Sequence, residues 1–294
     1  MKIFAQSICI FLIAATLSGC SIYNDPDIPE CPVDVRIELQ WIDTEPLSDT
    51  ENVDVKAYNG SDLIINTTSD IYGTDVILAP DRYEVVGYEQ SPNISISGHT
   101  ISVATDGNSR MMPINKFSAG VGSGTVLPNR AHQVIYLPMR EQVRELIIMV
   151  EFTGNLAQGV TGIDGDLEGV TLSRDINDAF PTASGRQRPY AISRTDEPYD
   201  FSREQRGNED IWFSGTRNLI GIDGDSDQIL NLEATLSDGQ AINYPVDVTG
   251  MMTGFHTENV SDPWYIILKL NLDLDMLITI EDWYGGTDSN MIAE

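Results

Sequence analysis

Positive charge is scarce in this chain. Its 294 residues include 17 lysines and arginines against 45 aspartates and glutamates, which gives a formal net charge of −28. A surface with this balance repels nucleic-acid phosphates and anionic lipid headgroups. We therefore expect no nucleic-acid partner, and we expect the excess of carboxylates to keep the protein soluble.

The chain also lacks an apolar run of the roughly 20 residues that cross a bilayer as a helix. A shorter run, Ile8–Leu17, follows Lys2 and leads into Leu17-Ser18-Gly19-Cys20. This segment resembles the signal of bacterial lipoproteins, whose lipobox reads Leu-(Ala/Ser)-(Gly/Ala)-Cys. The resemblance implies a signal peptide over residues 1–19 and lipidation of Cys20. The alternatives are a secreted protein without lipid and an uncleaved anchor.

Cysteine is rare, and the three present are Cys9, Cys20 and Cys31. Cys9 would leave with the signal and Cys20 would carry lipid, so the processed chain would keep only Cys31. We therefore expect no intrachain disulfide, and the hydrophobic core must hold the fold without one. We interpret Cys31 as a small, half-buried residue, with pairing to another chain as the alternative.

Motifs that carry catalysis are missing as well. The histidines are only His99, His132 and His256, none stands in a His-Glu-x-x-His pattern, and no Gly-x-Ser-x-Gly elbow occurs. The glycine-rich segment Ser118–Gly124 lacks the lysine of a phosphate-binding loop, and we interpret it as a flexible loop. Nothing singles out a glycosidase pair among the 45 carboxylates. The sequence predicts no enzyme and no cofactor.

What the chain has in abundance is strand periodicity. Apolar residues alternate with polar ones from Val33 to Trp41, which indicates a half-buried strand. Leu146–Val150 is apolar throughout, as a central strand covered on both faces is. Further strand pairs are expected around turns at Asn59-Gly60, Pro80-Asp81, Gly98-His99 and Asp238-Gly239. No helical period persists over three turns beyond the signal, so we predict an all-β fold.

These strands predict two tandem β-sandwich domains joined near Pro138, over residues 33–138 and 139–294. Residues 20–32 contain three prolines and are interpreted as an extended, lipidated tether. Residues 175–210 look polar and irregular, and we expect an exposed insert that either meets an acidic partner or only neutralises nearby acid. Its arginines are Arg186, Arg188, Arg194, Arg203 and Arg206.

One acidic stretch has the spacing of a calcium loop. Asp164, Asp166, Glu168 and Asp175 fall at positions one, three, five and twelve of an EF-hand loop. Flanking helices are not evident, and Asp-Gly is also a common turn pair. We interpret the stretch as turns and expect no metal; calcium at these four carboxylates is the alternative.

Several segments resemble one known family. They are Leu78-Ala79-Pro80-Asp81-Arg82-Tyr83 continuing to Tyr88, Leu137-Pro138-Met139-Arg140 followed by Val143–Ile147, and the late Tyr244–Thr249. Together they are similar to the FimB-type fimbrial anchor and accessory lipoproteins of Bacteroidales. The resemblance implies two transthyretin-like β-sandwiches, no enzymatic activity, and a lipoprotein of the outer membrane that anchors, caps or decorates a surface fimbria.

Two functions follow as rival expectations. In the first, lipid at Cys20 holds the protein to the outer membrane while its sheet edges accept strands from other fimbrial subunits. The last strand, Met276–Trp283, would then either complete its own sandwich or pair with a neighbouring subunit. In the second, the protein is a surface glycan-binding lipoprotein. Its candidate sugar platform is Trp41, Trp212, Trp264 and Trp283, although Trp41 fits a core position better.

Overall fold

The structure is a computed structural model that describes residues 31–46, 52–108, 110–128, 130–154, 156–178, 197–200, 202–206, 210–256, 261–272 and 278–287. Side chains are described outside 178, 197–206, 210–211 and 278–284. These residues form β-strands and three single-turn 3-10 helices, η1 (Ala157–Gly159), η2 (Ile176–Asp178) and η3 (Thr249–Met252). The all-β prediction is confirmed. Among these residues, none belongs to a helix long and apolar enough to cross a membrane.

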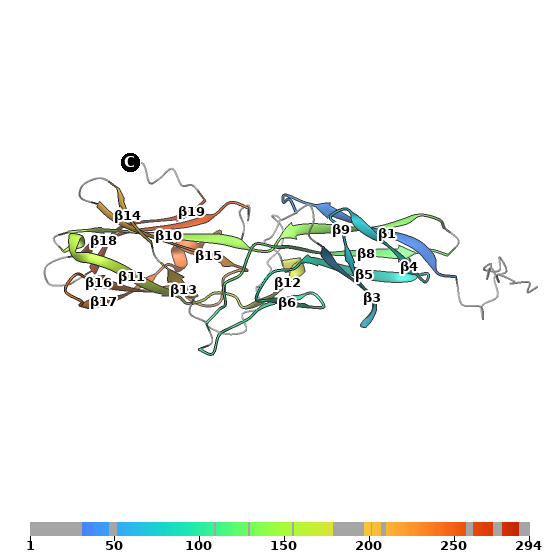
Figure 1. Ribbon diagram of the computed structural model, residues 1–294, viewed down its shortest axis with the longest axis horizontal. Coiled ribbons are helices and arrows are strands. Elements are labelled where there is room, and N and C mark those ends of the chain that lie inside the picture. The colour runs from blue at the N-terminus through green and yellow to red at the C-terminus, as the bar shows by residue number, and fades with distance from the viewer. Residues whose placement is uncertain are drawn as a thin grey trace, which may run out of the picture.

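The N-terminal half, on the right in Figure 1, is a sandwich. Its strand order is β3-β2-β5-β8-β9-β1-β4. Neighbouring strands are antiparallel except β1 and β9, which run parallel. β8 and β9 share only two paired positions, so the sheet turns a corner there and its two parts face each other across a common core. The strands are β1 (Val33–Trp41), β2 (Val53–Asn59), β3 (Asp62–Ser69), β4 (Gly73–Leu78), β5 (Asp81–Glu89), β8 (Ser118–Val126) and β9 (Gln133–Glu141).

β4 and β5 do not form the hairpin predicted around Pro80-Asp81. β4 pairs with β1, while β5 pairs with β2 and β8. The Tyr83 hydroxyl donates to the backbone oxygen of Ala79 at 3.0 Å. This bond fixes a corner at which the chain crosses between the two parts of the sandwich, as a tyrosine corner does in other sandwiches. The predicted turn is present, and the predicted pairing is wrong.

The glycine-rich segment interpreted as a flexible loop is the strand β8. It pairs with β5 from Asp81↔Val126 to Tyr88↔Ala119. A Cβ at Gly120 would lie 1.9 Å from the backbone oxygen of Pro138, and one at Gly122 would lie 2.3 Å from that of Tyr136. The glycines therefore permit the backbones of β8 and β9 to approach closely at the corner of the sandwich.

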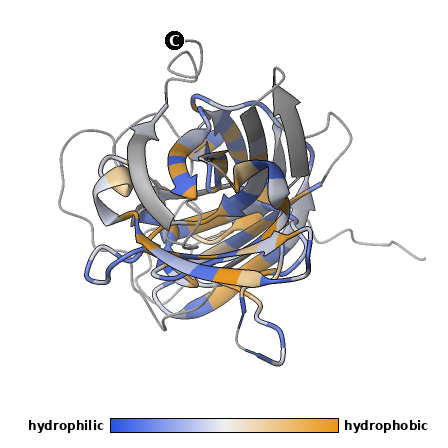
Figure 2. Ribbon diagram, turned by 90° about the vertical axis from the view of Figure 1, so that its left-hand side faces the viewer, coloured by the Kyte–Doolittle hydropathy of each residue, from blue (hydrophilic) through white to orange (hydrophobic). Residues whose placement is uncertain are grey.

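The C-terminal half is a second sandwich with sheet orders β14-β15-β10-β18-β19 and β13-β11-β16-β17. Leu146, Ile148 and Val150 of the central strand β10 are fully buried, which confirms the prediction for this segment. Seen from this end, the strands alternate between hydrophobic and hydrophilic residues (Figure 2). The strands are β10 (Arg144–Thr153), β11 (Val160–Leu167), β13 (Glu197–Asp200), β14 (Ser202–Arg206), β15 (Asp210–Leu219), β16 (Ile229–Leu236), β17 (Ala241–Asp247), β18 (Trp264–Leu272) and β19 (Ile278–Gly286).

The stretch expected to be an irregular insert contains two of these strands. β13 pairs with β11, and β14, which includes Arg203 and Arg206, pairs with β15. Both are the last strands of their sheets in the described chain. A polar sequence suits an edge strand, because it discourages pairing with other molecules. A strand without an apolar face shows no alternation of apolar and polar residues, so the sequence pattern did not indicate these two strands. Arg186, Arg188 and Arg194 lie outside the described residues, so their exposure stays a prediction.

A third, small sheet joins the two halves. It consists of β6 (Ile94–Ser97) and β7 (Thr100–Val103) from the N-terminal half and β12 (Ser173–Asp175) from the C-terminal half, in the order β12-β7-β6. The larger core cluster is likewise shared, since it includes Phe117 and Ala119 as well as residues up to Leu272. The predicted domain boundary at 138/139 falls within β9, and the division into domains stays a prediction.

Candidate interaction sites

The predicted lipidation site, Cys20, lies outside the described residues, and its modification stays a prediction. Cys31 is disulfide-bonded in the structure. The sequence contains only two other cysteines, Cys9 and Cys20. The expectation that Cys31 finds no partner within the chain is therefore wrong for the full-length protein. That expectation concerned a processed chain, in which Cys9 is removed and the thiol of Cys20 carries lipid.

The structure does not gather the four carboxylates of the alternative calcium site. Asp164 and Asp166 are alternate residues of β11, so they lie in a row along one face of a strand rather than around a loop. Asp166 Oδ2 accepts from Arg110 Nη2 at 3.1 Å, and Glu168 Oε1 accepts from Asn231 Nδ2 at 3.1 Å. Asp175 lies in β12, in a different sheet. Among the residues with described side chains, no group of three or more candidate ligands could hold a metal ion.

The tryptophans with described side chains do not form a sugar platform. Trp264 is 1% exposed and donates from Nε1 to the backbone oxygen of Met251 at 3.0 Å. Trp41 packs at the border of the N-terminal core and donates to the backbone oxygen of Ile71 at 2.8 Å. Both rings are used within the fold, as the core interpretation of Trp41 anticipated. Trp212 is half-buried, and the side chain of Trp283 is not described.

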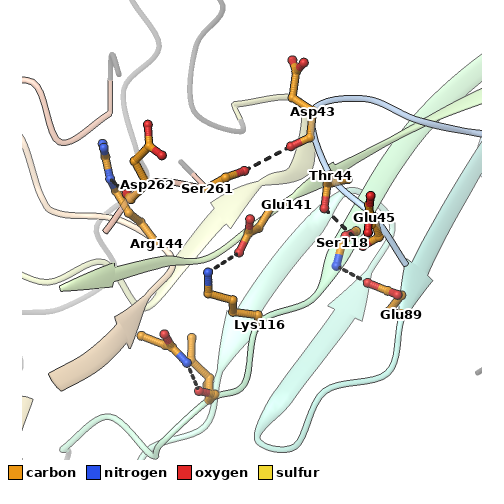
Figure 3. A network of polar contacts seen from close by, with 12 residues as sticks. Asp43, Thr44, Glu45, Glu89, Lys116, Ser118, Glu141, Arg144, Ser261 and Asp262 are labelled. Atoms are coloured by element: carbon orange, nitrogen blue, oxygen red, sulfur yellow. Dashed lines mark hydrogen bonds and ion pairs between the residues drawn. The ribbon is translucent and has the colours of Figure 1, made fainter. Parts of the chain in front are cut away.

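Polar contacts concentrate where the two halves meet (Figure 3). The Ser261 hydroxyl donates to the backbone oxygen of Asp43 at 3.1 Å, joining segments 218 residues apart. Lys116 and Glu141 form an ion pair at 3.3 Å close to the end of β9. Gln142, which follows β9 directly, is 0% exposed and donates from Nε2 to the backbone oxygen of Ala119 at 3.0 Å. The link between β9 and β10 is therefore a packed joint.

Two buried arginines complete this joint, and sequence reasoning missed both. Arg174 donates to the backbone oxygens of Ile220 and Gln142, each at 2.7 Å. Arg144 donates from Nε to the backbone oxygen of Asp262 at 3.0 Å, and its guanidinium lies 4.8 Å from the ring centre of Trp264. No local pattern distinguishes an arginine that bonds distant carbonyls from one that faces water. The only available signal was the presence of cations in such an acidic chain.

His256 lies beside these arginines. Its Nε2 accepts a hydrogen bond from the backbone N–H of Ile222 at 2.9 Å, which requires a neutral ring. Burial, together with the positive charges of Arg174 and Arg144, lowers the pKa of His256 to about 4. The imidazole therefore acts at neutral pH as a fixed hydrogen-bond acceptor inside the joint.

The third sheet carries a second contact between the halves. His99, in the turn between β6 and β7, places Nε2 2.6 Å from Glu84 Oε1. Its Nδ1 lies 4.0 Å from Asp175 Oδ2 of β12. Val103 donates to the backbone oxygen of Leu172 at 2.9 Å, which continues the pairing of β7 with the segment of β12. The hairpin of the N-terminal half has thus accepted a strand from the C-terminal half.

The last two strands form as a pair. β18 buries alternate residues from Trp264 to Leu272, so one of its faces is continuous and apolar. β19 pairs with β18 alone and is the last strand of its sheet in the described chain. The final strand therefore lies at an edge of its sheet in the described part of the chain.

A polar cleft of about 330 Å³ lies on the outer face of the β11-β16-β17 sheet. Asp164, Glu233 and Asn243 stand side by side across the three strands, and Asp166, Asn231 and Pro245 form the next row. Arg110 reaches the cleft from the N-terminal half through its bond to Asp166. Carboxylates, amides and a guanidinium suit the hydroxyl groups of a sugar, although no tryptophan lines this cleft.

The fold that these residues define is a pair of joined β-sandwiches, each with edge strands in the described part of the chain. No protein-family model matches the chain, and no curated protein matches it in sequence. Solved structures do match it. A protein of Bacteroides ovatus provisionally described as an adhesin has a TM-score of 0.58 and 16% identity, over 88% of this chain and 96% of that one.

The fimbrial anchor protein Mfa2 of Porphyromonas gingivalis matches with a TM-score of 0.61 and 10% identity, over 88% of this chain and 98% of that one. A protein of Bacteroides thetaiotaomicron provisionally described as polysaccharide binding has a TM-score of 0.52 and 12% identity, over 89% of this chain and 99% of that one. At these identities the likeness establishes a shared fold. The resemblance to fimbrial anchor and accessory proteins is confirmed at that level.

Proposed function

We propose that this protein is an anchor or accessory subunit of a surface fimbria and that it is not an enzyme. The observation that carries the proposal is the likeness to Mfa2, which extends over 88% of this chain and 98% of that chain. The arrangement of strands fits the role, because both sandwiches end in edge strands whose backbone groups can pair with another subunit.

In this proposal, lipid on Cys20 holds the N-terminus in the outer membrane. More than one acyl chain makes such anchoring stable. Residues 20–32 would separate the lipid from β1 by at most about 45 Å, the reach of an extended chain of that length. The protein would therefore stand close to the membrane, with its C-terminal half directed away from the tether at β1.

Anchoring is tested by the variant Cys20→Ala in cells that make the fimbria. Loss of lipidation should move the protein, and the fimbriae attached to it, from the cell surface into the medium. Cys31→Ala is the matched control, since it replaces another cysteine and leaves the lipobox intact. Fimbriae that stay on the cells in the Cys20→Ala strain would contradict the anchoring role.

Partner subunits would attach by strand addition at the edge formed by β19. Truncation after Asp275 removes this strand and distinguishes two arrangements. If the strand serves only the protein's own sandwich, the truncated protein loses its cooperative unfolding transition. If the strand is exchanged with a neighbour, the truncated protein still unfolds cooperatively but no longer co-purifies with fimbrial subunits. A truncated protein that folds and still binds them would exclude the exchange.

Glycan binding is the second candidate, and the polar cleft on the β11-β16-β17 sheet favours it. The fold is also that of a protein provisionally described as polysaccharide binding. Glycan arrays with the wild-type protein and Asn243→Ala test this candidate, because Asn243 is exposed and lines the cleft. A sugar that binds equally to both proteins would not bind in the cleft.

A further inference from the structure

The outer edge of β6 is open to another strand. β7 pairs with β6 on one side and with β12 on the other, and β12 comes from the other half of the molecule. In the part of the chain that the structure describes, no strand pairs with the opposite edge of β6. The β7 edge of this hairpin therefore pairs with a strand distant in sequence. The β6 edge has the same kinds of backbone N–H and C=O groups, and no strand of the described chain pairs with it.

The hairpin geometry identifies the backbone groups at the open edge. Gly98, with φ 57, and His99 form a two-residue turn flanked by the pair Ser97↔Thr100. The two residues that flank such a turn form backbone hydrogen bonds with each other, and along an antiparallel ladder only every second pair does so. The backbone groups of Ser97 and Ser95 therefore point toward β7. The N–H and C=O of Ile96 and the C=O of Ile94 consequently point to the open edge. The Ile94 N–H already bonds the backbone oxygen of Ser91 at 3.3 Å.

A groove of about 370 Å³ runs beside this edge. Ile94, Ser95 and Ile96 line one side of it, and Asp54 and Tyr88 line the other. Asp54 and Tyr88 are directly opposite each other in the pairing of β2 with β5, so they share one face of that sheet. The groove therefore lies between β6 and this face of the β2–β5 pair.

The next strand position would lie about 4.8 Å beyond β6, above the side chains of β2 on this face. These side chains are Asp54, Lys56 and Tyr58, which alternate along the strand. Lys56 lies over the ring of Tyr88, with its Nζ 5.1 Å from the ring centre. Leu63 of β3, opposite Tyr58, is 50% exposed. The floor of the vacant position therefore combines the apolar surface of Tyr58, Tyr88 and Leu63 with the charged side chains of Asp54 and Lys56.

We propose that the outer edge of β6 binds an extended segment of another polypeptide, which adds to the β12-β7-β6 sheet as a fourth strand. Its alternate apolar residues cover Tyr58 and Tyr88, and a lysine or arginine meets Asp54. Main-chain hydrogen bonds to Ile94 and Ile96 supply affinity, and the groove supplies selectivity. A net charge of −28 disfavours a second copy of this chain as the donor. This site goes beyond the fimbrial role, and its failure would leave that role unaffected.

Nuclear magnetic resonance with a synthetic peptide tests the site. The probe is a capped hexapeptide of lysine, threonine, valine, threonine, tyrosine and threonine, whose lysine, valine and tyrosine share one face of the strand, added to the isotope-labelled protein. We expect the peptide to slow hydrogen exchange at the Ile96 amide at least tenfold. An Ile96 amide that the peptide leaves unchanged, or one already protected in the protein alone because its own chain occupies the edge, would overturn the proposal.

Two variants assign the binding to this edge. Ile96→Pro removes the outward N–H and leaves the β6–β7 bonds in place, so it should abolish binding, while Ile96→Val should preserve it. Asp54→Lys should weaken binding of the lysine peptide at least fivefold and favour the same peptide with aspartate in place of lysine. Asp54→Lys does not alter the backbone of β6, so it remains informative if the proline variant fails to fold. Unchanged binding in Ile96→Pro, or unchanged preference in Asp54→Lys, would place the peptide elsewhere.

Discussion

Arg174 donates from Nη2 to the backbone oxygen of Gln142 at 2.7 Å, and this bond ties the strand β12 to the joint between the two halves. Arg174 is 2% exposed and Gln142 is 0% exposed, so the bond forms away from water. A buried carbonyl that loses its donor bears the full cost of desolvation. The relative position of the two sandwiches is therefore fixed by specific hydrogen bonds in addition to apolar packing.

The first prediction concerns this arginine. Arg174→Met keeps the apolar stem but leaves the carbonyls of Gln142 and Ile220 without their donor, so it should lower the free energy of unfolding by about 3 kcal/mol. Arg82→Met is the control, because Arg82 is exposed on β5 and should change stability by less than about 0.5 kcal/mol. Urea unfolding measures both; equal effects would show that the buried bonds contribute little.

The second prediction concerns pH. The pKa of His256 is about 4 in the folded protein, against about 6.5 for an unfolded histidine. The unfolded state therefore takes up a proton first as the pH falls, and the contribution of neutral His256 should be full above about pH 6.5 and lost toward pH 4. The loss amounts to about 3 kcal/mol. Urea unfolding at several pH values should show this slope in the wild-type protein and in the exposed control His132→Asn, and a smaller slope in His256→Gln.

The third prediction concerns the close approach of β8 to β9. Gly120→Ala places a methyl group against the backbone oxygen of Pro138, so the strands must separate, and we expect a loss of at least about 2 kcal/mol. Gly162→Ala in β11 is the matched control, since nothing lies within 4 Å of the added carbon. Thermal unfolding of both variants should show a lower midpoint for Gly120→Ala alone.

Local sequence patterns predicted much of the fold because they report burial on one face of a strand. Apolar and polar residues alternate clearly in β1 and β18. Gly60 and Gly239 have positive φ, as expected in the hairpin turns that the sequence predicted at these glycines. The failures arise where distant segments decide the structure. The glycines of β8 look like a loop until the backbone of β9 is placed against them, and the partner of β4 is set by a corner at Tyr83. β14 lies at an edge and needs no apolar face.

The candidate sites were harder to predict than the fold. Sequence spacing grouped Asp164 with Asp175, but an extended strand and a separate sheet place them apart. Arg174 and Gln142 gave no local signal, because a buried polar residue is recognised by the groups around it in the fold and not by its neighbours in sequence. The open edge of β6 likewise depends on which strands the finished topology leaves without partners.

The parallel ladder between β1 and β9 has a mechanical consequence. Tension on the tether would enter at the first residue of β1, and it would leave through the last residue of β9 into β10. Because the two strands run in the same direction, these points lie at opposite ends of the ladder, and its bonds from Val35 to Trp41 would bear load together in shear. β10 and β18 repeat the arrangement in the other half. Unfolding by a force along the molecule would therefore require all the hydrogen bonds of a ladder to break together, which slows the rate of unfolding under force.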